Sequence, residues 1–166
     1  MKKIIFAVVL FFICFSGFAQ TGIYSGGLWS TPQRSKGLLV RPEVGVSDGF
    51  TVKATVGSQL TRQFFVGGGL GLAFRSVGSS ISNGTSGIKV AIPLFANARC
   101  YLTKSLSAPF LELECGIKIQ PAINASQINM YFSPAIGYDI KDFDIKVEFP
   151  NMRGVGFFIG YNIGFK

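Results

Sequence analysis

The sequence predicts an all-β protein, an eight-stranded antiparallel transmembrane β-barrel of the up-and-down type. Three observations support this fold class. From residue 38 onward, apolar residues alternate with polar or small ones, which is typical of strands with two different faces. Turn residues interrupt the alternation at short intervals and delimit eight strands, an even number as in bacterial outer-membrane barrels. One face of all eight strands is free of charge.

Composition sets the limits on function. The 166 residues suit a single barrel domain, and 48% of them are hydrophobic while only 14% are charged. The chain has no His, which excludes Ser-His-Asp and Cys-His catalysis and His-ligated metal sites. We therefore expect a protein that is not an enzyme and that holds no cofactor and no metal.

The first nineteen residues have the three parts of a secretory signal peptide. Residues 1–3 carry two lysines, residues 4–15 are apolar, and small residues occupy the −3 and −1 positions at Gly17 and Ala19. The apolar stretch is too short for a transmembrane helix, which needs about 20 residues. We expect export and cleavage after Ala19.

A lipoprotein anchor on Cys14 is the alternative for this segment, although Ile13 stands where that signal needs a small residue. After cleavage the chain would begin with residues 20–37, which are rich in Gly, Ser and Thr and show no period. We interpret them as an N-terminal periplasmic arm that precedes a barrel of residues 38–166.

Eight strands follow the arm, and their connections alternate in length. The predicted strands are residues 38–47, 50–60, 64–74, 88–101, 109–120, 128–140, 143–149 and 155–165. The longest connections, residues 75–87 and 121–127, are rich in Ser, Gly and Asn. Outer-membrane barrels have short periplasmic turns and longer outer loops. This pattern places the two long connections outside and both chain termini in the periplasm.

The apolar face can be followed strand by strand. In chain order it comprises Val40, Val44, Val46; Phe50, Val52, Ala54, Val56, Leu60; Phe64, Val66, Leu70, Leu72, Phe74; Ile88, Val90, Ile92, Leu94, Ala96, Ala98; Leu111, Leu113, Ile117, Ile119; Met130, Phe132, Ile136, Ile140; Ile145, Val147; and Phe157, Ile159, Tyr161, Ile163, Phe165. An unbroken face of this kind suits lipid contact, because an Arg or Lys at the bilayer midplane costs about 2–4 kcal/mol.

The opposite face carries six basic and six acidic residues among Gly, Ser, Thr, Asn and Gln: Arg41, Glu43, Lys53, Lys89, Arg99, Glu112, Glu114, Lys118, Asp139, Asp144, Lys146 and Glu148. We predict that all of them except Asp139 form an ion-pair network inside the barrel. A neutral set is expected in a narrow lumen, where an unpaired charge is expensive. Inward glycines on the third and last strands would leave room for large side chains. Eight strands enclose a space that side chains can fill, so we expect a packed polar lumen.

Two alternatives remain open at this point. A soluble periplasmic barrel of the lipocalin type would place the apolar face inside around a ligand. A narrow passive channel or a small-solute binder would keep the membrane barrel but leave the lumen open. The preferred function is a structural or surface-interaction role through the outer loops.

Several segments resemble small outer-membrane β-barrels of Bacteroidetes-type bacteria, which are porin-like or OmpA/OmpX-like. The residues that carry the resemblance include 56–60, 65–71, 92–99, 108–112, 133–138 and 160–165. The resemblance covers about residues 38 to 166 and implies a transmembrane barrel in the outer membrane of a Gram-negative cell, but no substrate. Such barrels often end on an aromatic residue that the assembly machinery recognises, whereas Lys166 follows Phe165 here.

The expected partners follow from this placement. They are outer-membrane lipid, the barrel-assembly machinery through the C-terminal strand, and an unidentified surface or periplasmic protein. Basic residues outside the strands would contact anionic lipid headgroups, and no nucleic acid is expected as a partner.

Two motifs have a structural and a functional interpretation. The glycine-rich residues 66–71 lack dinucleotide-binding spacing and a following helix, so they are better explained as lumen-facing strand residues. Cys100 and Cys115 would face lipid, and the hairpin register places them opposite Leu111 and Ala96, which disfavours a disulfide.

Overall fold

The computed structural model describes residues 37–77, 87–121 and 127–165. The predicted signal peptide, residues 20–36 of the predicted arm, the greater part of the two predicted outer loops and Lys166 lie outside the described residues. Residue 37, assigned to the arm from the sequence, already belongs to the first strand.

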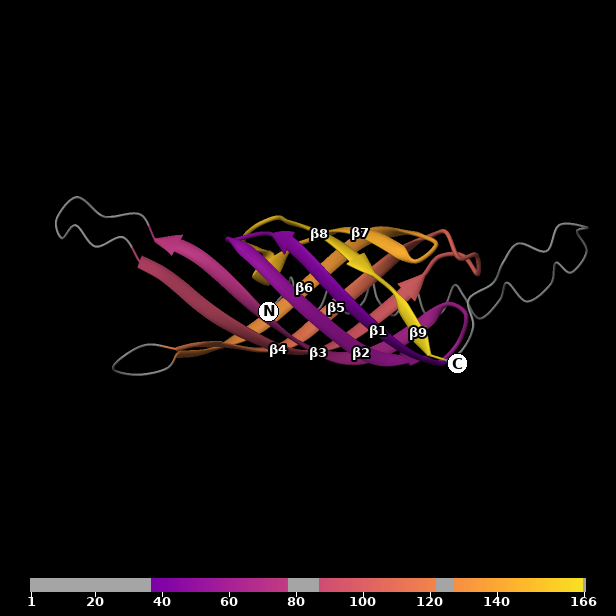
Figure 1. The fold of residues 1–166 in the computed structure, drawn as a ribbon, viewed down its shortest axis with the longest axis horizontal. Coiled ribbons are helices and arrows are strands. Elements are labelled where there is room, and N and C mark those ends of the chain that lie inside the picture. The colour runs from indigo at the N-terminus through magenta and orange to yellow at the C-terminus, as the bar shows by residue number, and fades with distance from the viewer. Residues whose placement is uncertain (1–36, 78–86, 122–126, 166) are drawn as a thin grey trace, which may run out of the picture. The chain divides into compact units, whose positions relative to one another are not determined.

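Antiparallel strands form a closed barrel (Figure 1). The strands are β1 (Gly37–Val46), β2 (Phe50–Gln59), β3 (Phe64–Val77), β4 (Gly87–Tyr101), β5 (Ala108–Gln120), β6 (Gln127–Ile140), β7 (Phe143–Glu148), β8 (Gly156–Tyr161) and β9 (Ile163–Phe165). Each strand from β1 to β7 pairs with the next one in the chain, and β8 and β9 both pair with β1, which closes the sheet. Because β8 and β9 lie on one line along β1, the barrel has eight strands, and the predicted fold class is confirmed.

The break between β8 and β9 has a local cause in the facing strand. The amide of Asn162 donates to the carbonyl of Asp142 at 2.6 Å, on the β7 side of the strand. Because backbone amides alternate in direction along a strand, the amide of Tyr161 points to the other side, toward β1. The common register of β8 and β9 puts Tyr161 opposite Pro42. Proline has no amide hydrogen to donate, so the ladder is interrupted there. Pro93 coincides with a similar gap between β3 and β4.

Two hairpins are longer than the wall of the barrel requires. β3 continues to Val77, three residues past its last pair with β2, and β6 begins eight residues before its first pair with β7. These hairpins, β3–β4 and β5–β6, lie at the end of the barrel away from the C-terminus (Figure 1). We call this end the mouth. The greater part of the two long loops predicted from the sequence connects these hairpins and is not described.

The connection from β7 to β8 also lies at the mouth and is anchored to β6. It contains η1, a 3-10 helix of residues Pro150–Met152, in which Asn151 and Met152 have φ angles of 48° and 55°. The side chain of Asn151 accepts a hydrogen bond of 3.0 Å from the amide of Phe132. Asn tolerates this left-handed conformation better than most residues. In the described part of the chain no helix is long and apolar enough to cross a membrane.

Candidate functional site: the charged interior and the mouth of the barrel

The interior of the barrel is built from charged side chains. Ten of them are buried with at most 3% of their surface exposed: Arg41, Glu43, Lys53, Arg99, Glu112, Glu114, Asp139, Asp144, Lys146 and Glu148. We call these ten residues the core network. The outward positions of the same strands are apolar and open, with Leu70 and Ile159 each 57% exposed. The polarity of a water-soluble protein is therefore inverted.

Lys146 occupies the centre of the core network. Its Nζ lies against four carboxylates, those of Glu43 (2.8 Å), Glu148 (2.9 Å), Glu114 (3.3 Å) and Glu112. Carboxylate oxygens of these four residues all lie within 4.8 Å of one another, as they do around a bound metal ion. The ammonium group of Lys146 takes that central position, so it provides the positive charge that holds the acids together.

Two arginines and a second lysine extend the core network. Arg99 pairs with Glu112 and Asp144, and with Asp139 at 3.1 Å. Arg41 bridges Glu43 at 3.0 Å and Glu112 at 3.2 Å. Lys53 Nζ contacts Glu148 and lies 3.0 Å from Glu114.

Two neutral polar side chains also donate hydrogen bonds to carboxylates of the core network. Tyr131 donates its hydroxyl to Glu114 at 2.7 Å, and Ser133 donates to Glu148 at 3.3 Å. These donors stabilise the ionised carboxylates where water is scarce.

Aromatic rings fill the space beside the ions. The guanidinium of Arg99 lies 3.7 Å from the ring centre of Phe110, and Lys53 Nζ lies 4.2 Å from that of Phe158. Such cation–π contacts are stronger when water is excluded. Glycine makes this packing feasible, because a Cβ on Gly69 would lie 2.6 Å from the ring of Phe95.

The structure brings nine of the eleven predicted network residues together. Lys89 and Lys118 are the other two, and they form no ion pair between described residues. They lie on the inward face, as predicted, but near the mouth, where β4 and β5 rise above the carboxylates. Asp139, which the sequence placed on the inward face without a role, joins the core network instead.

This placement corrects the predicted neutrality of the lumen. The core network has six carboxylates and four cations, an excess of two negative charges. The two lysines that would balance it line a pocket at the mouth.

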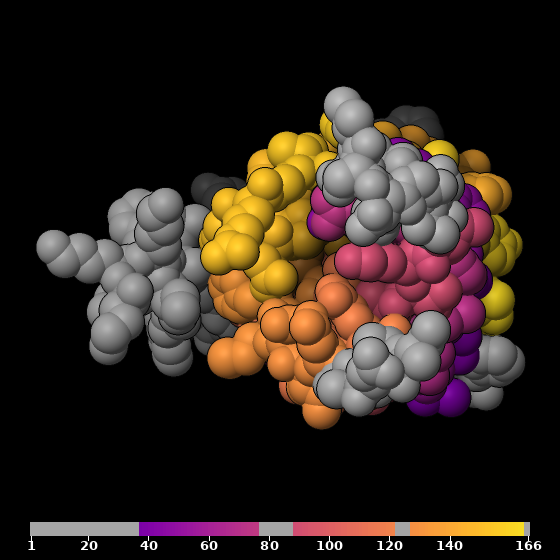
Figure 2. All heavy atoms as spheres, turned by 90° about the vertical axis from the view of Figure 1, so that its left-hand side faces the viewer, coloured from indigo at the N-terminus to yellow at the C-terminus, as the bar shows by residue number. Residues whose placement is uncertain are grey.

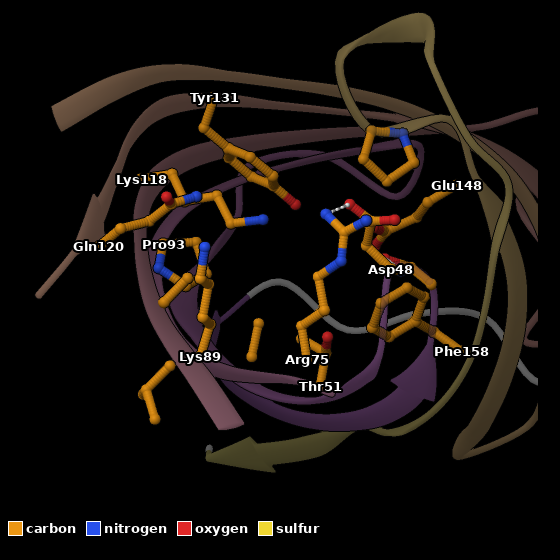
Figure 3. A pocket seen from close by; sticks show the side chains of 15 residues that line it. Asp48, Thr51, Arg75, Lys89, Pro93, Lys118, Gln120, Tyr131, Glu148 and Phe158 are labelled. Carbon is orange, nitrogen blue, oxygen red and sulfur yellow. Dashed lines mark hydrogen bonds and ion pairs between the residues drawn. The ribbon is translucent and has the colours of Figure 1, made fainter. Parts of the chain in front are cut away.

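The mouth contains a pocket of about 160 Å³. The end view shows the barrel hollowed here, between the orange strands and the magenta strands (Figure 2). Lys89, Lys118 and Arg75 extend into the pocket, while Glu148 and Phe158 belong to its wall (Figure 3). An exposed ion pair of 3.2 Å joins Arg75 to Asp48 in the β1–β2 turn.

No disulfide joins Cys100 to Cys115. The observed register pairs Cys100 with Leu111 and Cys115 with Ala96, which is the register expected from the sequence.

Comparisons with known proteins give a structural likeness only. No family model and no curated protein matches the chain. The N-terminal β-barrel domain of Pseudomonas aeruginosa OprF superposes with a TM-score of 0.52 at 11% identity, over 78% of this chain and 100% of that one. Two further barrels reach a TM-score of 0.41. They are Ail of Yersinia pestis (11% identity, 77% of this chain, 97% of that one) and a designed transmembrane barrel (16%, 80% and 100%). At these identities the likeness to OprF supports the barrel fold and no particular activity.

Proposed function

We propose that the chain is an exported outer-membrane β-barrel with a closed polar lumen, which acts as a scaffold that presents its mouth at the cell surface. One observation carries the proposal: the apolar side chains face outward and the ionised side chains face inward. In water this arrangement would expose a continuous apolar wall, which monomeric soluble proteins avoid. In lipid the same wall lies in its preferred solvent, and the closed sheet leaves no unpaired strand edge along the wall.

The height of the apolar wall fits a bilayer. On β3 the outward residues run from Phe64 to Phe74, with Val66, Leu70 and Leu72 between them. Ten residues of strand span about 33 Å, which is about 25 Å along the axis of a barrel whose strands tilt by about 40°. Outer-membrane barrels have an apolar band of about 25 Å with aromatic residues at both borders.

The filled interior favours a scaffold over a channel. Arg41 and Glu43 on β1 reach Glu112 on β5 and Lys146 on β7, so side chains from distant strands meet across the lumen. Each of these four residues is at most 3% exposed. A conducting pathway would have to separate these buried pairs, each of which costs about 3–5 kcal/mol to break.

The soluble alternative would require the apolar side chains to face inward and the charged ones to face water. A lipocalin-like barrel needs an apolar cavity inside, whereas the interior here is occupied by the core network. Apolar positions such as Leu70 and Ile159 would then be its water-exposed surface. The charged interior and the open apolar wall therefore favour a membrane location over the soluble alternative.

Cell fractionation tests the location. We expect the full-length protein in the outer-membrane fraction, released by detergent but not by salt, and migrating faster on a gel before boiling than after. Recovery in the soluble periplasm would contradict the proposal.

Labelling of intact cells tests the orientation of the mouth. Asn151→Cys lies at the mouth and Lys104→Cys lies in the β4–β5 turn at the other end, and both positions are exposed. In a background with Cys100 and Cys115 replaced by alanine, a membrane-impermeant maleimide should label Asn151→Cys only. Labelling of Lys104→Cys alone would mean that the mouth faces the periplasm.

A further inference from the structure

Three basic side chains meet at the mouth of the barrel. Lys89 on β4 and Lys118 on β5 project into the 160 Å³ pocket, and Arg75 on β3 projects toward them (Figure 3). Arg75 and Lys89 are directly opposite in the β3–β4 ladder. Like charges opposite each other in a sheet destabilise the pairing. Neither lysine forms an ion pair between described residues.

Among the described residues, no carboxylate side chain forms an ion pair with either of these lysines. The chain contains eight Asp and Glu residues, and all eight lie in the described part. Six belong to the core network, Asp48 pairs with Arg75, and Asp142 lies in the β6–β7 turn at the other end. The undescribed stretches 78–86 and 122–126, which connect the hairpins of the mouth, contain no acidic residue. Asp48 and Glu148 line the same pocket but already pair with other cations, so an anion from another molecule could serve as the direct counter-charge of Lys89 and Lys118.

The donors at the pocket suit an oxyanion. Lysine binds phosphate as a point charge, and the guanidinium fork of arginine matches two oxygens at once. Arg75 donates from Nη1 to Asp48, and its guanidinium makes no second hydrogen bond to a described residue. Thr51 and Gln120 add neutral polar groups to the wall. Liquid water takes about 30 Å³ per molecule, so 160 Å³ leaves room for a group of several heavy atoms.

We propose that the mouth is a binding site for a phosphate- or sulfate-type oxyanion, held between Lys89 and Lys118 with Arg75 as a third donor. The ligand is either a free anion or the headgroup of a membrane lipid, and both have the same chemistry. The site itself does not depend on the membrane location proposed above, because all of its residues belong to the barrel. Only the lipid source rests on that proposal.

Titration of the full-length protein with inorganic pyrophosphate tests the site. The protein is held in an uncharged maltoside detergent at constant ionic strength, and binding is followed by calorimetry. We expect saturable binding of one pyrophosphate per chain, weakened about tenfold or more in Lys89→Gln/Lys118→Gln. The matched control, Arg62→Gln/Lys104→Gln, removes two exposed positive charges at the opposite end and should bind as the unmodified protein does.

A second arm distinguishes the source of the anion. The protein is reconstituted in phosphatidylcholine vesicles with and without phosphatidic acid, and the lipids retained after purification are counted. Retention of phosphatidic acid by the unmodified protein but not by Lys89→Gln/Lys118→Gln would support a lipid headgroup at the same site, even if free pyrophosphate does not bind. If neither pyrophosphate nor phosphatidic acid distinguishes the two proteins, the proposal is overturned.

The competing explanation is that the two lysines only offset the two excess carboxylates of the core network. In that case Lys89→Gln/Lys118→Gln should lower the urea midpoint of unfolding relative to the control and leave anion binding unchanged, and that result too would overturn the proposal. The pyrophosphate titration needs no membrane, so its outcome is separate from the fractionation experiment that tests the proposed location.

Discussion

Replacing Lys146 by methionine tests whether the core network holds the barrel together. Methionine keeps a side chain of similar length but removes the ammonium group that lies against four carboxylates. The excess of two negative charges in the interior becomes three. Because the side chain of Lys146 is 0% exposed, water cannot replace the lost charge without opening the lumen.

The size of the effect follows from the contacts. At about 3 Å and an effective dielectric constant of about 20, each contact contributes about 5 kcal/mol of attraction. Burying an ion costs several kcal/mol, so one contact would roughly break even while four leave a clear surplus. Removing one partner of a buried pair typically costs about 3–5 kcal/mol, and we expect Lys146→Met to reach the upper part of that range.

Urea unfolding of the reconstituted protein, followed by far-ultraviolet circular dichroism, measures the effect. Lys104→Met is the matched control, because Lys104 is exposed in the β4–β5 turn. If Lys146→Met does not fold, the double variant Lys146→Met/Glu114→Gln returns the interior to an excess of two negative charges. It should fold with part of the stability recovered, because glutamine can still accept the hydrogen bond from Tyr131. Equal unfolding midpoints for Lys146→Met and Lys104→Met would refute the reasoning.

Three further outcomes are expected. Leu70→Arg and Ile159→Arg should each prevent recovery of heat-modifiable barrel from membranes, because both side chains are 57% exposed on the apolar wall and an Arg near the bilayer midplane costs about 2–4 kcal/mol. The control Arg75→Glu should assemble, and equal yields of barrel from the three variants would mean that the outward face is wrongly assigned. The unmodified protein in planar bilayers should show no steady unitary conductance, and large regular openings would favour a channel. Gly160→Leu should lower the free energy of unfolding by about 1–3 kcal/mol or more, because a Cβ at this position would lie 3.1 Å from the side chain of Glu43 and against Asp144. An unchanged urea midpoint would show that the lumen is loosely packed.

Alternation in the sequence is enough to predict the strands and their faces. A period of two gives each residue one of two sides, and the unbroken apolar side left little freedom in choosing the register. The β4–β5 pairing of Cys100 with Leu111 follows from the hairpin length alone. The predicted strand ends differ from the observed ones by at most three residues, as at Val77, where the two strands of a hairpin pair beyond the wall of the barrel.

Alternation does not give the depth of a residue in the barrel. Lys89 and Lys118 have the same inward parity as Arg99 and Glu112, yet only the latter pair joins the core network. Strand tilt and stagger determine which inward residues share a level, and these depend on closure of the whole sheet. The contact of Phe110 with Arg99 cannot be predicted from alternation for the same reason: Phe110 lies on the inward face by parity, but which ion it meets depends on that level.

The distribution of charge along the barrel connects the interior to the mouth. Two excess carboxylate charges lie in the core network, and Lys89 and Lys118 lie in the pocket directly bordered by Glu148. The core therefore attracts the lysines toward the interior, and at the same time it repels any anion that approaches the floor of the pocket. Lys53 and Lys146 pair with Glu148 and reduce this repulsion at short range. An anion would consequently bind near the rim, between the lysine ends and Arg75, and the same negative interior would oppose its passage through the barrel.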